Sequence, residues 1–202
     1  MSTDLYKTIT KATTEVLYKD RKSKFIGYAF PLDKLEAVKP ILESLKKKHH
    51  NANHACYAWQ LGTDSISYRA NDDGEPNNSA GMPIYGQIQA FDLTNVLVVV
   101  IRVFGGTKLG VGGLIQAYRT AAKMALESAD IVEKLLEDQF KLEFDYAEMD
   151  KVMRMIKKHK VNLISQNLTN KCVYVIGIRK SESDLFENQL QTMHKIKINK
   201  LL

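Results

Sequence analysis

The segment from Val96 to Ala122 constrains the fold most, because it runs from an apolar strand through a loop of five glycines and one lysine into a helix. Glycines tolerate positive φ and let the backbone approach a ligand closely. The first turn of the following helix adds unpaired N–H groups and partial positive charge. Together with Lys108, this arrangement predicts a pocket for an anionic ligand.

The spacing of this glycine loop matches neither common phosphate-binding motif. A P-loop needs Lys and Ser/Thr where Val111 and Gly112 stand, and the GxGxxG pattern fails at its third position, which is Ile115. The loop therefore predicts an anion site without identifying a nucleotide-binding fold.

The composition is that of an ordinary globular protein, with 202 residues of which 45% are hydrophobic and 26% charged. The longest apolar run, Val96 to Ile101, is far too short to span a bilayer. The first residues contain no apolar leader, and Cys56 and Cys172 lie far apart in sequence, so we expect a reducing, cytoplasmic setting. The net charge of +6 is a mild excess that favours RNA or acidic partners but is also typical of many proteins that bind neither.

The chain is predicted to be α+β, with a first domain at residues 1–132 and a second at residues 137–202. The second domain follows the order βαββαβ, which is that of a ferredoxin-like sandwich. Its strands are expected to begin near Phe140 and to cover 161–168, 171–178 and 195–202, with helices at about 148–158 and 182–193. The boundary is expected at 129–138. In the first domain, we expect helices at 35–48, 84–91 and 113–128, and strands at about 13–18, 23–30, 54–61, 65–70 and 96–104.

Three carboxylates, Asp72, Asp73 and Glu75, lie within four residues of a long, turn-rich loop. Carboxylates this close could hold Mg²⁺ or Ca²⁺, or act as acid and base. The alternative is an Asx turn that caps the next helix. Arg102 near the end of the apolar strand needs a partner if it is buried, and this acidic loop is the obvious candidate.

Three histidines, His49, His50 and His54, lie just before and within the next strand. His50 and His54 have the spacing of a zinc-binding helix, but the strand pattern that follows argues against one. We therefore expect no metal site and no cofactor here. The aromatic residues are expected to pack in cores rather than stack on bases, namely Tyr57, Trp59, Tyr68 and Phe104.

Four separated motifs together resemble the YigZ/IMPACT family. They are KSKFIGYA at 22–29, a His-Ala-His-Cys-Tyr-Ala pattern at 49–58, the acidic loop with its Ala-Gly-x-Pro continuation at 72–83, and the glycine segment at 102–114. Their order and spacing agree with that family over about residues 15–128. Two positions depart from its pattern: Val103 replaces an expected tyrosine, and Gln116 replaces a usual arginine, which removes one cation beside the glycine loop.

The resemblance implies a first domain like the second domain of a small-subunit ribosomal protein, an α/β sandwich, and a second domain like the last domain of elongation factor G. Both analogies point toward RNA or the ribosome, and the family's eukaryotic members regulate translation. Kinase-pathway regulation is not transferred, because it depends on an additional N-terminal module.

The leading hypothesis is a non-enzymatic, translation-associated regulator that binds RNA or a ribosomal surface. The alternative is an enzyme acting on a small phosphorylated or peptide-like substrate, possibly with metal assistance. Its catalytic candidates are His54, Asp73 and Glu75. In the leading hypothesis Asp73 and Glu75 are expected to orient Arg102, beside which they would lie. The residues expected to bind the anionic ligand are Arg102, Gly105, Gly106, Lys108, Gly110, Gly112 and Gly113.

Overall fold

The computed structural model describes residues 4–201. The chain divides into two compact units. The first comprises Tyr6–Lys134, and the second comprises Leu135–Leu202 together with the segment that ends at Leu5. Within the described residues, no helix combines the length and apolar character needed to cross a membrane.

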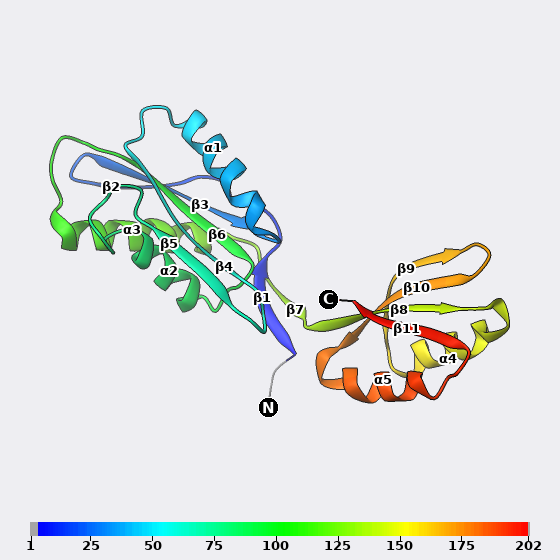
Figure 1. Ribbon diagram of the computed structural model, residues 1–202. Helices are drawn as coiled ribbons and strands as arrows, with labels where there is room; N and C mark the ends of the chain where they lie inside the picture. The colour runs from blue at the N-terminus through cyan, green and yellow to red at the C-terminus, as the bar shows by residue number, and fades with distance from the viewer. Residues whose placement is uncertain (1–3, 202) are drawn as a thin grey trace. The chain divides into compact units, whose positions relative to one another are not determined.

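The first unit is built on a five-stranded antiparallel sheet with the order β2-β3-β6-β4-β5. Its strands are β2 (Val16–Asp20), β3 (Ser23–Pro31), β4 (His54–Leu61), β5 (Ser67–Asn71) and β6 (Val96–Val103). Helices α2 (Gly81–Ala90) and α3 (Gly110–Glu127) cover one face, and α1 (Val38–Lys48) lies on the other (Figure 1).

Strand β6 lies at the centre of the sheet, which explains its continuous apolar sequence. Val96, Val98 and Val100 belong to the core shared with α2 and α3, whereas Leu97 and Val99 belong to the core under α1. Side chains alternate between the two faces of a strand, so a strand covered on both faces has no position for a polar residue. The apolar run therefore continues to Ile101, and Arg102 is the first charged residue of the strand.

The three helices of the first unit start at positions different from those predicted. Helix α1 begins at Val38, after a short 3-10 helix, so Pro40 lies in its first turn. Helix α2 begins at Gly81 rather than 84, with Pro83 in its first turn. Helix α3 begins at Gly110 rather than 113. Proline and glycine are tolerated in these first turns because first-turn residues need no intrahelical N–H partner.

Two strands were not predicted. β1 (Leu5–Ile9) and β7 (Ile131–Leu135) pair in a separate two-stranded sheet. β7 lies where a domain boundary was expected, and nearly all of its residues are exposed. A strand that buries no face carries no alternating pattern, which is why periodicity did not reveal it.

The second unit contains the predicted succession of strands and helices. Its elements are β8 (Glu137–Phe144), α4 (Met149–Lys158), β9 (Asn162–Leu168), β10 (Cys172–Arg179), α5 (Ser183–Gln191) and β11 (Ile196–Leu201). The antiparallel sheet has the order β11-β8-β10-β9. The core forms where the alternating Phe140, Leu142 and Phe144 of β8 meet buried residues of α4 and α5.

The segment that ends at Leu5 is bonded to this second unit through Asp4. The Asp4 carbonyl accepts a hydrogen bond from the Leu136 N–H at 2.8 Å. Its carboxylate accepts one from the Ser181 N–H at 3.1 Å and another from the Ser181 hydroxyl. Asp4 therefore contacts residues far along the chain.

The expectation that all four aromatic residues pack in cores was wrong for two of them. Trp59 is buried and Tyr57 packs against the core under α1. Tyr68 is 54% exposed and stacks on Tyr85 with 4.3 Å between ring centroids. Phe104 is 41% exposed because β6 ends just before it.

Candidate functional site

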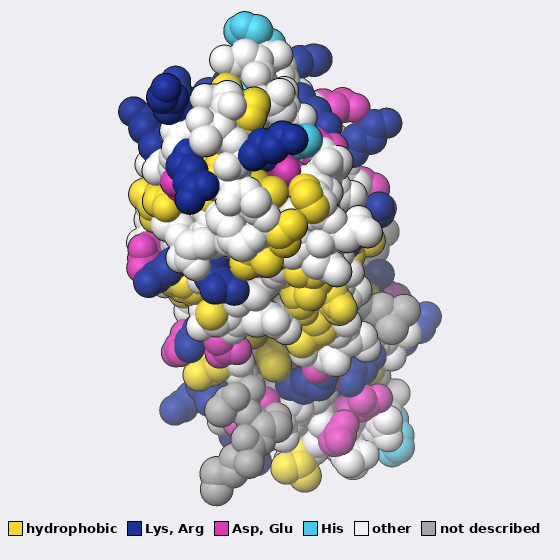
Figure 2. Space-filling view, turned by 90° about the vertical axis from the view of Figure 1, so that its left-hand side faces the viewer, with side chains coloured by type: hydrophobic (Ala, Val, Ile, Leu, Met, Phe, Trp, Pro, Cys, Tyr) yellow, Lys and Arg dark blue, Asp and Glu magenta, His cyan; other side chains and the backbone are white. Residues whose placement is uncertain are grey.

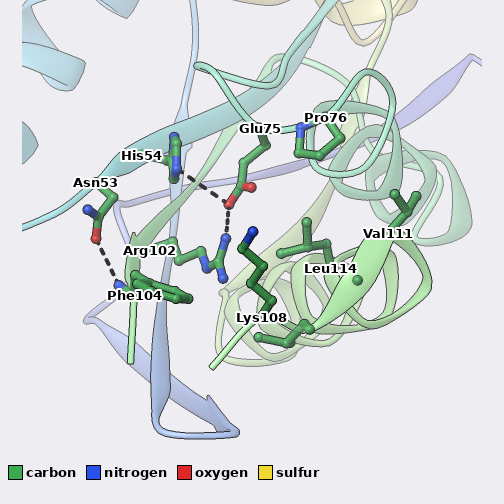
Figure 3. Close-up of a pocket in the computed structure, with 11 residues that line it drawn as sticks. Asn53, His54, Glu75, Pro76, Arg102, Phe104, Lys108, Val111 and Leu114 are labelled. Atoms are coloured by element: carbon green, nitrogen blue, oxygen red, sulfur yellow. Dashed lines mark hydrogen bonds and ion pairs between the residues drawn. The ribbon is translucent and has the colours of Figure 1, made fainter. Parts of the chain in front are cut away.

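A cavity of about 470 Å³ lies in the first unit where four segments meet (Figure 3). They are the start of β4, the acidic loop, the end of β6 and the start of α3. This volume is in the range of small-molecule sites, which are mostly apolar with a few placed polar groups. The lining residues are Asn53, His54, Glu75, Pro76, Arg102, Phe104, Lys108, Leu109, Gly110, Val111 and Leu114.

A buried ion pair forms one wall of this pocket. Arg102 Nη1 donates to Glu75 Oε1 at 2.6 Å, and only 7% and 4% of the two side chains are exposed. The guanidinium also lies over the rings of Phe25 and Phe104, with its carbon 5.5 and 5.4 Å from their centroids. Arg102 Nε is buried and has no hydrogen-bond partner within the described chain. The acidic loop thus supplies the partner predicted for Arg102, while part of the guanidinium's donor capacity stays unused.

Tyr118 from α3 is a second hydrogen-bond partner of Glu75. The sequence analysis did not identify it. Its hydroxyl donates to Glu75 Oε1 at 2.7 Å, and the Cys56 Sγ lies 3.3 Å from the same hydroxyl. Burial, with the nearby Cys56 and Glu75, raises the pKa of Tyr118 far above its ordinary value, so the phenol remains a donor. Burial likewise raises the pKa of the Cys56 thiol. Tyr118 shares the apolar stripe of α3 with Leu114 and Ala121, and a polar hydroxyl on such a stripe is the signal that could have found it.

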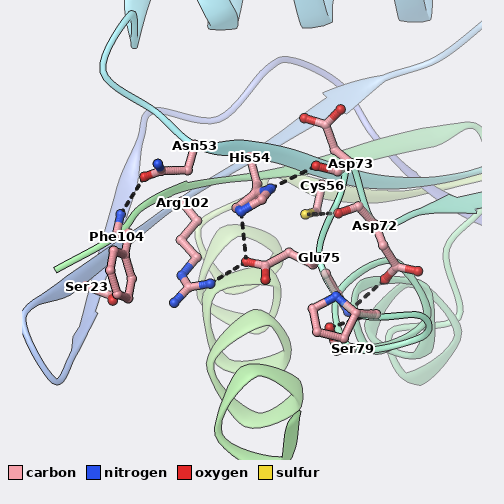
Figure 4. Close-up of polar contacts among 12 residues, drawn as sticks. Ser23, Asn53, His54, Cys56, Asp72, Asp73, Glu75, Ser79, Arg102 and Phe104 are labelled. Atoms are coloured by element: carbon pink, nitrogen blue, oxygen red, sulfur yellow. Dashed lines mark hydrogen bonds and ion pairs between the residues drawn. The ribbon is translucent and has the colours of Figure 1, made fainter. Parts of the chain in front are cut away.

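His54 faces Glu75 across the pocket (Figure 4). Its Nδ1 lies 2.8 Å from the Asp73 carbonyl oxygen. Because a carbonyl only accepts, Nδ1 carries a proton, which directs the other ring nitrogen toward Glu75. The distance from Nε2 to Glu75 Oε1 is 3.9 Å, and a quarter of the His54 side chain is exposed. The ring is therefore fixed in orientation and accessible from the pocket.

The other two carboxylates of the acidic loop have structural roles. Asp72 accepts hydrogen bonds from the N–H groups of Asn78, Ala80 and Gly81 at 2.8–2.9 Å, which caps the start of α2. Asn71 Oδ1 accepts the Asp73 N–H at 2.8 Å, as in an Asx turn. The capping alternative for this loop is therefore correct for Asp72.

Asp73 does not lie beside Arg102, and that part of the prediction was wrong. Its carboxylate accepts the Ala55 N–H at 2.7 Å and pairs with Lys46 at 3.2 Å. Asp73 and Gly74 both have positive φ, 41° and 91°, so the chain turns sharply between Asp73 and Glu75. The turn sends the Asp73 side chain toward β4 and α1, and the Glu75 side chain into the pocket.

Only one of the five glycines predicted to bind the ligand, Gly110, lines the pocket. A Cβ on Gly105 would lie 2.0 Å from the Lys22 carbonyl carbon, so this glycine permits close backbone packing. A Cβ on Gly113 would lie 2.9 Å from Leu109 Cβ. Gly106 and Gly112 have open space around them, and Gly106 has a φ of 87°. The loop is shorter than predicted because Gly110, Gly112 and Gly113 already belong to α3.

The start of α3 nevertheless offers donors to the pocket. Leu109 occupies the N-cap position and provides no side-chain cap for the first turn. Lys108 is exposed, and within the described chain no carboxylate lies within ion-pair distance of its amine. An uncapped helix start with a free ammonium group beside it is a favourable environment for an anion.

The histidines do not form a metal centre with neighbouring carboxylates. His49 Nε2 lies 2.7 Å from the Tyr28 hydroxyl, which also donates to Glu15 at 2.8 Å. Burial and then the Lys48 charge lower the pKa of His49. No group of three or more His, Cys, Asp or Glu side chains suited to a metal ion occurs among residues 4–201.

Comparisons with known proteins match the part of the chain that carries this pocket. The family model described as the Impact N-terminal domain matches residues 21–126. An IMPACT family member from Haemophilus influenzae is 33% identical over 172 residues, which cover 84% of each chain. A Protein IMPACT homolog from Saccharomyces cerevisiae is 36% identical over 96 residues, covering 45% of this chain and 36% of that one. A crystal structure of a hypothetical protein aligns over 98% of both chains with a TM-score of 0.67 at 22% identity, a likeness of fold.

Proposed function

This chain belongs to the IMPACT family, and on that premise we propose that it is a translation-associated regulatory protein that binds RNA or a ribosomal surface through the pocket between the acidic loop and α3. The family resemblance supports the link to translation. The pocket supports an anionic ligand, because cationic and N–H groups converge on it.

The fold also supports the proposed link to RNA or the ribosome. We propose that the first unit corresponds to the second domain of a small-subunit ribosomal protein. The second unit corresponds to the ferredoxin-like last domain of elongation factor G, an assignment supported by its βαββαβ order and its β11-β8-β10-β9 sheet. Both analogies point toward RNA or the ribosome.

The observation that carries the proposal is the convergence of Arg102, Lys108 and the uncapped start of α3 on one pocket. Lys108 neutralises a phosphate, and the first-turn amides of α3 position it. Glu75 holds Arg102 in place through a charge-assisted hydrogen bond. On the face in Figure 2, Lys and Arg side chains lie scattered among acidic and apolar ones, which favours a local contact over a broad basic surface.

Co-sedimentation with ribosomes at low and high salt tests this function. The wild-type protein is expected to co-sediment at low salt and to dissociate as salt rises, because phosphate contacts release counterions. Lys108→Glu is expected to abolish the salt-sensitive fraction. Lys47→Glu, which makes the same charge change at an exposed position of α1 outside the pocket, is expected to behave like wild type. Absence of the wild-type protein from every ribosomal fraction, or equal behaviour of the two variants, would contradict the proposal.

A second candidate function is an enzyme acting on a small phosphorylated substrate, and the geometry of His54 favours it. An imidazole with Nδ1–H bonded to a backbone carbonyl and its Nε2 open to a pocket is arranged as a general base. Glu75 Oε1 lies 3.9 Å from this Nε2.

Thermal unfolding with nucleotides, phosphorylated sugars and divalent cations tests the second candidate. A ligand at a hundred times its Kd adds about 2.7 kcal/mol to the free energy of unfolding. Turnover that is lost in His54→Gln while the ligand still stabilises the variant would support the enzyme. No stabilisation by any of these compounds would count against it.

A further inference from the structure

We infer that the pocket takes a terminal phosphate group, a phosphate monoester dianion, rather than a phosphodiester within a nucleic-acid strand. The inference rests on the proposed function, which places a phosphate in this pocket, and adds which chemical class of phosphate fits. The inference is supported by the burial of Arg102, by the free hydrogen-bond donors of the pocket, and by the exposed and apolar residues that line it.

The depth of Arg102 argues against an internal phosphodiester. The Arg102 side chain is 7% exposed, and its guanidinium is held by Glu75 and lies over the rings of Phe25 and Phe104. A phosphodiester carries a nucleoside on each side, and both would have to fit beside this buried cation. A monoester carries one substituent, so its phosphate can reach a buried cation while the substituent points outward.

The donors that remain free fit the three terminal oxygens of a monoester. Arg102 uses Nη1 for Glu75, and no other hydrogen bond from its guanidinium is found within residues 4–201. The first turn of α3 adds uncapped N–H groups, and Lys108 adds an ammonium group. Because Glu75 offsets the charge of Arg102, the net positive charge comes from Lys108 and the helix start. A diester offers only two non-bridging oxygens and one negative charge to these groups.

Exposed and apolar residues of the pocket lining can contact the substituent of the monoester. Phe104 is 41% exposed, with Arg102 on one side of its ring. Leu114 and Val111 form an apolar wall on α3 (Figure 3). An exposed aromatic ring beside a phosphate site can stack on a nucleobase, as in single-strand binding proteins. The structure therefore fits the phosphorylated end of an RNA strand or a nucleoside monophosphate.

Fluorescence anisotropy with matched oligoribonucleotides tests the inference on the full-length protein. One short single strand carries a 5′-phosphate, and the same strand carries a 5′-hydroxyl. The phosphorylated strand is expected to bind at least about tenfold more tightly, equivalent to about 1.4 kcal/mol. Inorganic phosphate is expected to compete with it. Lys108→Ala is expected to remove the preference, whereas Lys47→Ala keeps it.

The outcomes separate this inference from the proposed function. Equal affinity for the two strands, with both weakened by Lys108→Ala, would overturn the terminal-phosphate inference and leave RNA binding intact. Binding of a nucleoside monophosphate and inorganic phosphate without any oligoribonucleotide would support the inference and contradict RNA binding. Absence of binding by all probes would overturn both. Chemical unfolding of Lys108→Ala is the check that the exposed substitution leaves the fold unchanged.

Discussion

The carboxylate of Glu75 sets the charge that the pocket offers to an anion. It is almost fully buried and accepts hydrogen bonds from both Arg102 and Tyr118. Removing one partner of a buried ion pair leaves the other charge uncompensated, which costs about 3–5 kcal/mol. Removing the Glu75 charge also frees the charge of Arg102 for a bound anion.

We therefore expect Glu75→Gln to change stability and affinity in opposite directions. The variant keeps an oxygen acceptor but loses the charge, so its free energy of unfolding is expected to fall by about 3 kcal/mol. Its affinity for the 5′-phosphorylated oligoribonucleotide is expected to rise. Urea unfolding and fluorescence anisotropy measure the two effects.

The matched control is Asp73→Asn, which keeps an acceptor for the Ala55 N–H and lies outside the pocket lining. Its affinity for the phosphorylated strand is expected to stay near the wild-type value. A fall in affinity for Glu75→Gln that parallels its loss of stability would show that Glu75 does not offset the charge of Arg102.

At the scale of residues, the sequence predicted that a buried Arg102 requires an acidic partner. It did not predict which carboxylate of the acidic loop is that partner. Arg102 lies near the end of a buried strand, so a partner from the acidic loop could be expected. Asp73 and Glu75 differ only by the turn between them, and a positive φ at a non-glycine residue has no clear sequence signal. Tyr118 was missed because aromatic residues on an apolar stripe are usually read as packing.

At the scale of elements, the glycine segment joins β6 to α3 by close backbone packing. Gly105 lies against the backbone of Lys22 and Ser23, which cannot move aside as a side chain can. Its N–H also donates to the Ser23 hydroxyl at 3.1 Å. The glycine at this position is therefore required by the crossing of two segments, not by a ligand.

We expect Gly105→Ala and Gly112→Ala to shift stability in opposite directions. In Gly105→Ala the new Cβ would lie 2.0–2.4 Å from backbone atoms, and the clash is expected to cost about 3 kcal/mol or more. In Gly112→Ala the new Cβ meets nothing within 4 Å, so the helix is expected to gain up to about 1 kcal/mol from the higher helix propensity of alanine. Urea unfolding measures both. Equal destabilisation of the two variants would contradict the packing role of Gly105.

Elements that bury a face were predictable from periodicity, and the ends of helices were not. The central strand and the amphipathic strand β8 follow directly from their apolar positions. The starts of α2 and α3 lie among residues that serve equally well in loops and in first helical turns. β1 and β7 pair across more than a hundred residues, and their patterns give no sign of it.

At the scale of the whole molecule, the second unit carries an ion pair whose carboxyl has a pKa shifted by folding. In the second unit Lys200 lies 2.6 Å from Asp138. Burial acts to raise the pKa of Asp138, but hydrogen bonds from Lys200 and Ser183 outweigh it and hold the pKa below its ordinary value of 3.8. A carboxyl whose pKa is lowered by folding stabilises the fold above its unfolded pKa, and this stability disappears as the pH falls through the folded pKa.

Asp138→Asn is therefore expected to destabilise the second unit at neutral pH by about 1 kcal/mol. The difference from wild type is expected to shrink as the pH falls below 3.8. The only tryptophan, Trp59, lies in the first unit, so its fluorescence follows that unit while circular dichroism follows both. A difference that stays constant with pH, or that appears in the Trp59 signal, would contradict this assignment.

The membership of Asp4 in the second unit could not be predicted, because its bond to the Ser181 N–H spans 177 residues. That separation has a consequence for the order of folding during protein synthesis. A chain grows from its N-terminus at about 5–20 residues per second, so Ser181 follows Asp4 after roughly 9–35 s. By then all of Tyr6–Lys134 has been synthesised. The hydrogen bonds between Asp4 and Ser181 therefore form late in synthesis. The direction of translation lets the unit that carries the pocket fold first.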